Sequence, residues 1–131
     1  MDSVIHFEMP YVDRERMKTF YESAFGWQTQ TLGAEMGNYV LATTAETGAD
    51  GRPKEPGAIN GGFYERPDDP AGQHPSVVIA VNDIGAAIRK ITAAGGTLFG
   101  EPMEIPGVGQ YASFRDTEGN RVSILQPMAR S

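Results

Sequence analysis

The sequence predicts an α+β protein made of two tandem modules, each ordered strand–helix–strand–strand–strand. Seven positions separate His6 from Asp13, and seven separate Ser76 from Asp83. In both places a short apolar strand pattern leads to an acidic residue, a helical pattern and then glycine. Three short stretches rich in β-branched and aromatic residues follow each helix. The equal spacing and the matching helix starts favour a duplication over two unrelated strand–helix units.

Length and composition limit the organisation and the partners. The 131 residues are expected to form one domain, with a first module over residues 1–66, a linker over 67–75 and a second module over 76–131. The net charge of −6 disfavours nucleic acid and anionic membranes as partners. Cysteine is absent, which excludes disulfides, thiolate metal sites and a cysteine nucleophile. The beginning of the sequence has no leader pattern and no apolar run of membrane-spanning length, so a cytoplasmic location is expected.

The first module is read from its helix outward. Asp13 is expected to cap the helix, and Gly26 to end it in a left-handed conformation. The apolar stripe between them has helical spacing and comprises Met17, Phe20, Tyr21, Ala24 and Phe25. Strands are expected over residues 27–32, 38–44 and 58–66.

The second module repeats this plan. Asp83 or Asn82 is expected to cap its helix, and Gly95 and Gly96 to end it. The helical stripe comprises Ile84, Ala87, Ile88 and Ile91. Strands are expected over residues 96–106, 109–116 and 120–127, and the last two are joined by a hairpin turn in which Gly119 and Asn120 can adopt positive φ.

Two irregular stretches interrupt the modules. Residues 43–57 form a long polar loop that is either a lid over a binding site or a mobile surface segment. Residues 66–75 are rich in proline and glycine and are expected to lack regular structure. His74 lies in this linker and is expected to be solvated.

The stretch HFEMPYVDRERMKTFYESAFGW resembles the vicinal-oxygen-chelate superfamily, which includes glyoxalases, bleomycin-resistance proteins and extradiol dioxygenases. VVIAVNDI with AAGG and the closing DTEGNRVSILQP add to the resemblance, and INGGFYERP and EIPGVGQYASFRDTEGN are most similar to small bacterial glyoxalase-like proteins. The resemblance implies that each module curls its mixed sheet into a half-open cup, and that two cups enclose a cleft. In metal-dependent members, His or Glu ligands from the first and last strands of each module hold a divalent ion in that cleft.

The implied ligand positions match this sequence only once. His6 stands at the first position, but Ser76 and Ser123 stand at two others, and the fourth falls near Gly61 without a carboxylate or imidazole. Glu8 shares a strand face with His6, yet two ligands are too few for a tight site. We therefore expect no metal ion and no other cofactor, although an altered ligand set stays open.

Strand alternation sorts the side chains of the sheet. The side facing the helices is expected to carry Ile5, Phe7, Met9, Val77, Ile79, Val81, Val122 and Ile124. The opposite side is expected to line the cleft, with Tyr39 or Asn38 close by, and its candidate ligand-binding residues are His6, Glu8, Asn60, Tyr64, Ser76, Tyr111, Arg121 and Ser123. His6 has the alternative of a purely structural role.

Three functions remain open from the sequence. The first is metal-free binding of a small organic molecule, as in the drug-sequestering members of the resembled family. The second is a lyase, isomerase or dioxygenase with an altered metal-ligand set, or one with acid–base chemistry at His6 and Glu8. The third is an interaction module with an unused cleft. Pairing of modules, within the chain or with a second chain, buries sheet edges. The resemblance implies a homodimer, because family members of this length commonly form one.

Overall fold

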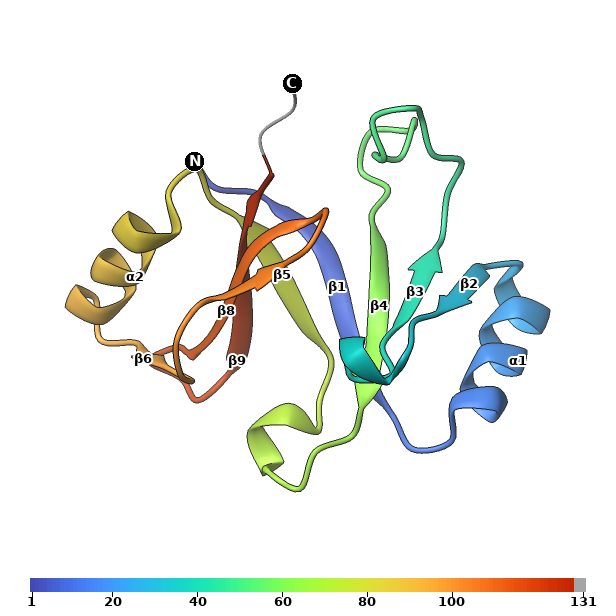
Figure 1. Ribbon diagram of the computed structural model, residues 1–131, viewed down its shortest axis with the longest axis horizontal. Helices are drawn as coiled ribbons and strands as arrows, with labels where there is room; N and C mark the ends of the chain where they lie inside the picture. Colours follow the sequence, from blue (N-terminus) through green and yellow to red (C-terminus); the bar gives the residue numbers. More distant parts are fainter. Residues whose placement is uncertain (129–131) are drawn as a thin grey trace. The chain divides into compact units, whose positions relative to one another are not determined.

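A computed structural model describes residues 1–128 and confirms the α+β fold class (Figure 1). The first half comprises β1 (Val4–Tyr11), α1 (Arg14–Phe25), β2 (Gln28–Thr31), β3 (Val40–Thr43) and β4 (Asn60–Glu65). The second half comprises β5 (Ser76–Ala80), α2 (Ile84–Ala93), β6 (Thr97–Leu98), β7 (Met103–Ile105), β8 (Gly109–Arg115) and β9 (Arg121–Pro127). Both halves follow the predicted order of one strand, one helix and further strands.

The chain forms two compact units, which we name the first unit, His6–Pro75, and the second unit, Met1–Ile5 with residues 76–128. In the first unit the strand order is β2-β3-β4-β1, and β1 and β4 run parallel. In the second unit the order is β5-β9-β8, with β5 and β9 parallel and both β6 and β7 antiparallel to β8. Each unit thus places its first strand parallel to its last, and antiparallel strands complete the sheet.

Helix α1 is capped as predicted but packs less than predicted. The Asp13 carboxylate accepts from the Arg16 amide, and Gly26 ends the helix with φ 72°. Met17 and Tyr21 pack against the core of the first unit, whose buried members are Tyr11, Val40, Ala42 and Phe63. Phe20 and Phe25 lie outside it, with 57% and 64% of their surface exposed. Ala24 is exposed as well, so only Met17 and Tyr21 of the predicted apolar stripe pack on the core.

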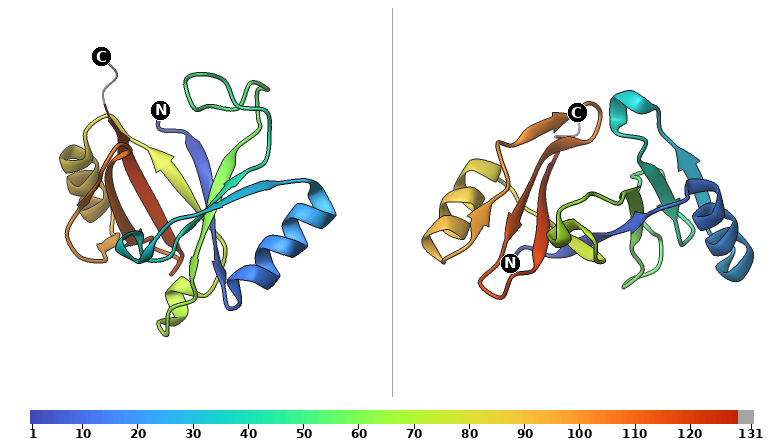
Figure 2. Two further views of the ribbon diagram at one scale, coloured as in Figure 1. Left: turned by 45° about the vertical axis from the view of Figure 1, so that its right-hand side comes forward. Right: turned by 90° about the horizontal axis from the view of Figure 1, so that it is seen from below.

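Helix α2 packs as its pattern predicts. Asp83, rather than Asn82, caps it by accepting from the Ala86 amide, and Gly95 follows its end with φ 104°. Ile84 is buried, and the rest of the stripe packs on a core of Val81, Ala112, Phe114 and Ile124. Figure 2 shows each helix against one face of its own unit's sheet. Within residues 1–128, neither helix has the length and apolar character needed to cross a membrane.

Four further expectations need correction. The strand expected over residues 96–106 is two short strands, because Gly100 adopts φ 85° between β6 and β7. The linker contains one 3-10 turn, Pro70–Gly72, which Asp69 caps and Pro70 begins. Asn120 does not adopt positive φ; Gly119 alone provides it in that hairpin turn. Ile5 and Val77 lie near the beginnings of their strands and are exposed instead of contributing to a core.

The loop over residues 43–57 folds back on itself. The Gly48 amide donates to the Arg52 carbonyl and the Lys54 amide to the Glu46 carbonyl, and Thr47 and Pro53 form an isolated bridge. An exposed ion pair between Lys54 and Glu46 spans 2.9 Å. These bonds give the loop a local structure of its own, while its role as a lid stays a prediction.

Candidate functional site

Polar side chains gather on the face of each sheet opposite its helix, which we call the helix-free face. In the first unit, Phe7 and Met9 pack against the core. His6 and Glu8 therefore lie on the helix-free face, because successive side chains of a strand alternate between faces. This part of the predicted sorting is confirmed.

His6 and Glu8 are joined through a third residue, Tyr39, which directly precedes β3. The Tyr39 hydroxyl donates to Glu8 Oε2 at 3.0 Å and lies 3.4 Å from His6 Nε2. Glu8 is only 6% exposed. A buried carboxylate is costly unless hydrogen bonds compensate for lost water. The phenol of Tyr39 supplies one such bond. Its oxygen also lies within reach of the His6 imidazole, so one hydroxyl contacts both side chains.

Burial controls the charge state of His6. Loss of water around the ring lowers the pKa of His6, and the Glu8 carboxylate opposes this by favouring the imidazolium. Because burial is the larger effect, the neutral ring is favoured at neutral pH. A neutral imidazole beside a phenol and a carboxylate can accept a proton from a bound molecule or return one.

Two other candidates in the first unit also bind their own chain. Asn60 Oδ1 accepts from the Thr44 amide at 2.8 Å, and Asn60 Nδ2 donates to Thr47 at 3.2 Å. The amide of Asn60 thus anchors the base of the 43–57 loop. The Tyr64 hydroxyl donates to the Gly72 carbonyl at 2.9 Å, which ties β4 to the linker. Both side chains have structural roles within the unit.

Hydroxyl groups form the centre of the helix-free face in the second unit. The Tyr111 hydroxyl is 2.7 Å from Ser123 Oγ, Ser113 Oγ is 3.0 Å from Ser123 Oγ, and Ser113 donates to Tyr111 at 3.3 Å. We call these three residues the hydroxyl cluster. Ser123 is 1% exposed and Ser113 6%. Ser123 pairs with Val78 on β5, and Ser76 lies two residues earlier on the same face of that strand.

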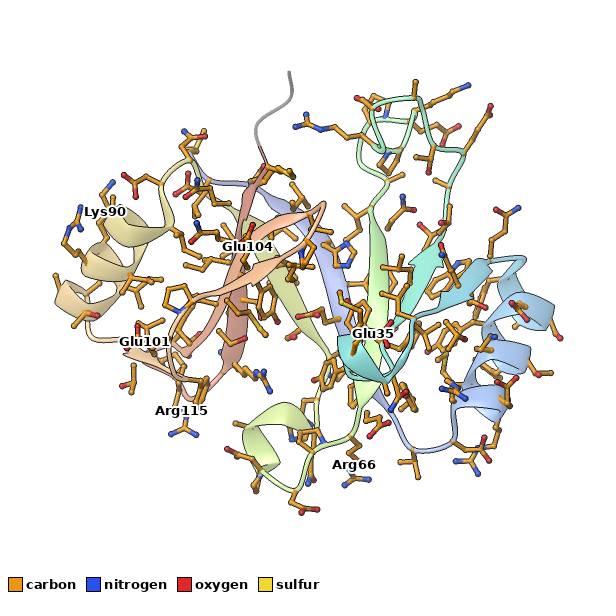
Figure 3. The ribbon with its side chains drawn as sticks, in the orientation of Figure 1. Glu35, Arg66, Lys90, Glu101, Glu104 and Arg115 are labelled. Atoms are coloured by element: carbon orange, nitrogen blue, oxygen red, sulfur yellow. The ribbon has the colours of Figure 1, made fainter. Side chains whose placement is uncertain are left out.

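Two arginines border the hydroxyl cluster. Arg121 Nη2 donates to Ser113 Oγ at 3.4 Å. Arg121 and Arg115 are direct partners on the antiparallel strands β9 and β8. Both guanidinium groups lie over the Phe99 ring, at 5.8 Å and 5.2 Å from its centroid. Figure 3 shows Arg115 at the β8–β9 turn end of this sheet. Cation–π contact with a shared ring offsets part of the repulsion between two like charges.

The structure therefore brings the sequence candidates together in two groups. His6 and Glu8 share one group in the first unit; Tyr111, Arg121 and Ser123 share another in the second unit. Tyr39, and not its neighbour Asn38, joins the first group, since Asn38 has φ 57° and donates to Glu65. Ser113 lies on the same strand face as Tyr111, two residues away, whereas nothing in the sequence indicated that Phe99 would reach both arginines.

The ligand set of the metal-dependent relatives is not reproduced in the described part of the chain. Among residues 1–128, no three side chains of His, Asp or Glu lie close enough together to hold a metal ion. Ser123, at one implied ligand position, carries a neutral hydroxyl that is bonded to Tyr111 and Ser113. Serine hydroxyls are weak ligands for divalent ions compared with imidazole or carboxylate.

Sequence comparison identifies the family. The model of the Glyoxalase/Bleomycin resistance protein/Dioxygenase superfamily matches residues 3–124. The chain therefore belongs to this superfamily, as the motifs and the repeated βαβββ plan predicted.

Individual relatives carry glyoxylase names. The protein named "Putative glyoxylase CFP32" of Mycobacterium bovis is 34% identical over 111 residues, which are 82% of this chain and 38% of that protein. Its counterpart in Mycobacterium tuberculosis gives the same figures. The chain thus spans about 38% of the length of these two curated relatives. A "Glyoxylase-like domain-containing protein" of Didymella fabae is 29% identical and is covered over 88% of its length, against 89% of this chain.

Solved structures share the fold at low sequence identity. Hypothetical protein BH1468 of Bacillus halodurans has a TM-score of 0.70 and 13% identity, with 99% of this chain and 97% of that chain covered. A variant of Streptomyces coelicolor methylmalonyl-CoA epimerase, in complex with 2-nitronate-propionyl-CoA, has a TM-score of 0.68 and 16% identity, with 96% and 97% covered. Identities this low establish the shared fold alone.

Proposed function

We propose that this glyoxalase-superfamily chain binds a small organic molecule through the polar groups of its helix-free faces, without the divalent ion of its metal-dependent relatives. Hydroxyl, guanidinium, imidazole and aromatic groups can each recognise such a molecule by hydrogen bonding and stacking. The proposal covers this chain only, since its longer relatives contain sequence beyond the matched region.

The state of Ser123 carries the proposal. This oxygen stands where the resemblance places a last-strand ligand, it is 1% exposed, and it lies within hydrogen-bond distance of two other hydroxyls. To bind an ion, this hydroxyl would have to give up hydrogen bonds that it already makes. It also lacks the negative charge that offsets the desolvation of a divalent cation. In the first unit, Glu8 is likewise engaged by Tyr39. The donor set therefore does not fit the family's ion.

A second candidate function is metal-free acid–base catalysis of an isomerase type. The buried Glu8, the Tyr39 hydroxyl and the His6 ring form the observation that favours it. In that case the imidazole, held neutral by burial, removes or returns a proton on a bound molecule. Several proteins of the same fold are methylmalonyl-CoA epimerases, which makes methylmalonyl-CoA a sensible first probe.

Metal content and thermal stability test the binding proposal. The purified chain is analysed for bound metal, and its melting temperature is then measured with divalent ions and with a panel of aromatic and carboxylate-bearing compounds. We expect substoichiometric metal and no rise in melting temperature with divalent ions. At least one compound should raise the melting temperature, and this rise should be smaller in Arg121→Met. Stoichiometric metal that His6→Ala removes would overturn the metal-free proposal, and a panel without any stabilising compound would count against binding.

Isotope exchange tests the second candidate. Methylmalonyl-CoA is incubated with the chain in deuterated water, and loss of its α-proton signal is followed by NMR. If the chain acts as an acid–base catalyst on this class of thioester, exchange is accelerated and His6→Gln removes the acceleration. Equal exchange with and without the protein rejects this substrate and favours the binding function.

A further inference from the structure

Tyr39 occupies a position on the first unit's sheet that depends on one glycine. We propose that Tyr39 is a positioning residue that links His6 and Glu8 through its hydroxyl, and that Gly62 is required because it leaves room for the Tyr39 ring. The proposal deepens the proposed function, on which it rests, by naming the residues that hold the two ionisable groups of the helix-free face in place.

The strand register brings these residues together. Glu8 on β1 is the direct partner of Gly62 on β4. On the other side of β4, Gly62 is the direct partner of Leu41 on β3. Tyr39 precedes Leu41 by two residues and therefore points to the same face. Its long side chain crosses above β4 to reach the Glu8 carboxylate on β1.

Space explains the glycine. A Cβ atom built on Gly62 would overlap the hydroxyl and ring carbons of Tyr39. The backbone does not require glycine here, because Gly62 is not among the residues with positive φ. Gly62 is nevertheless buried, at a strand position where glycine weakens a sheet unless something approaches closely. The approaching group is the Tyr39 ring.

The neighbouring glycine provides a comparison within the same strand. A Cβ atom on Gly61 would overlap the ring of Phe7, which packs on the core side. The two consecutive glycines thus serve opposite faces, as strand alternation requires. Gly61 admits a core aromatic ring, and Gly62 admits the aromatic ring that binds Glu8.

The direction of the hydrogen bonds follows from the donor inventory. Tyr39 has one hydroxyl hydrogen, and it goes to Glu8. The phenol oxygen can then only accept from His6, so Nε2 of His6 carries the proton in the contact at 3.4 Å. Nδ1 is left as the acceptor of the neutral ring. Tyr39 thereby fixes which nitrogen of His6 can take a proton or accept a hydrogen bond from a bound molecule.

A double-variant comparison tests the steric part without any ligand. Melting temperatures are measured for Gly62→Ala and Gly61→Ala, each alone and combined with Tyr39→Ala. We expect Gly62→Ala to lower the melting temperature, and expect most of that lowering to vanish in the Tyr39→Ala background. The lowering caused by Gly61→Ala should persist there, because its clash is with Phe7. An equal loss from Gly62→Ala with and without Tyr39 would overturn the proposal.

Histidine NMR tests the positioning part. The chain has two histidines, His6 and the exposed His74, so the ring nitrogens of His74 serve as an internal reference. We expect Tyr39→Phe, which keeps the ring and removes only the hydroxyl, to shift the Nε2 resonance of His6 and to leave His74 unchanged. Gly62→Ala should shift His6 in the same sense. Unchanged His6 resonances in Tyr39→Phe would sink the proposal even if Gly62→Ala cannot be folded.

Neither measurement depends on the proposed function. Failure of the binding screen with a positive variant comparison would leave Tyr39 and Gly62 as positioning residues of an unidentified site. A successful binding screen with unchanged His6 resonances would instead keep the binding function and reject the role of Tyr39.

Discussion

The two units share one plan but carry different chemistry on their helix-free faces. In the first unit an imidazole and a buried carboxylate meet at the Tyr39 hydroxyl. In the second unit the corresponding centre consists of the hydroxyls of Tyr111, Ser113 and Ser123. The centre of the face opposite the helix thus holds an imidazole and a carboxylate in one copy, and hydroxyls bordered by two arginines in the other. A duplicated scaffold can therefore keep its strands and caps while its polar faces diverge.

The two helices also differ in how deeply they are buried. Helix α2 buries Ile84 and packs its stripe on the core, whereas no residue of α1 is buried and both of its phenylalanines are exposed. Aromatic packing compensates for this shallow burial in the first unit. The rings of Tyr21 and Trp27 stack with their centroids 4.7 Å apart, and the centroids of Tyr21 and Phe63 are 5.2 Å apart. Aliphatic side chains dominate the core of the second unit. The same fold is stabilised by two different kinds of core.

The largest expected effect concerns the aromatic core of the first unit. Phe63 is 1% exposed and contacts Tyr21, Trp27 and Phe7. Phe63→Ala should lower the free energy of unfolding by about 3–5 kcal/mol, measured by urea denaturation. Phe20→Ala is the matched control, and its loss should stay near 0.5 kcal/mol, roughly the value for exposed sites. Similar losses for both variants would mean that α1 packs more tightly than its exposure indicates.

The next effect concerns the hydroxyl cluster. Ser123→Glu puts a carboxylate in a site that is 1% exposed, and it should cost about 3 kcal/mol or more because a buried charge loses its hydration. Ser123→Ala removes only hydrogen bonds and should cost about 1–2 kcal/mol. Denaturation is repeated with added divalent ions, which should not restore Ser123→Glu. Full recovery by one equivalent of an ion would show that the second unit retains a latent metal site.

The N-terminal caps of the two helices should contribute equally to stability. Asp13 and Asp83 each accept from the amide three residues later at 3.0 Å. Asp13→Ala and Asp83→Ala should therefore each cost about 1 kcal/mol in the free energy of unfolding. Asp→Asn at both positions, which keeps a capping oxygen, should cost much less. A large difference between the two alanine variants would indicate that packing changes the contribution of the caps.

The smallest effect is the pH dependence that His6 adds in the first unit. Burial lowers the pKa of His6 below the ordinary value of 6.5, so the folded protein binds this proton less readily than the unfolded chain. The stabilising contribution is complete above that ordinary value and is lost as pH falls through it toward the folded-state pKa. Denaturation midpoints from pH 8 to 5, roughly the range in which histidine titrates, should fall less steeply in His6→Gln than in the wild type. Equal slopes in His6→Gln and in the wild type would contradict the assignment.

Local patterns predicted most of the fold. The acidic caps, the glycine stops and the alternation along strands depend on residues within a few positions of one another, and the sequence displays them directly. The exceptions are residues whose environment is made by distant segments. Phe20 and Phe25 have helical spacing, but nothing nearby in the sequence says how wide a stripe the sheet can cover.

Strand alternation predicted which candidate side chains share a face of the sheet, but not how they bond to one another. Alternation placed His6 with Glu8 and Tyr111 with Ser123, because period-two patterns are local. It left Tyr39 and Asn38 as alternatives and could not reveal that the Tyr39 hydroxyl bonds to Glu8, since this contact spans 31 positions and crosses an intervening strand. It also gave no reason for Gly62, whose role depends on the ring that lies above it.

The sequence by itself determined the repeated strand–helix plan, the helix ends and the two polar faces, because each is set by residue type and local spacing. Only the tertiary structure decided which polar groups bond to each other and which apolar residues remain exposed. Those outcomes depend on strand register and on packing between segments that are far apart in the chain. Register and packing also position Tyr39, Gly62 and the hydroxyl cluster.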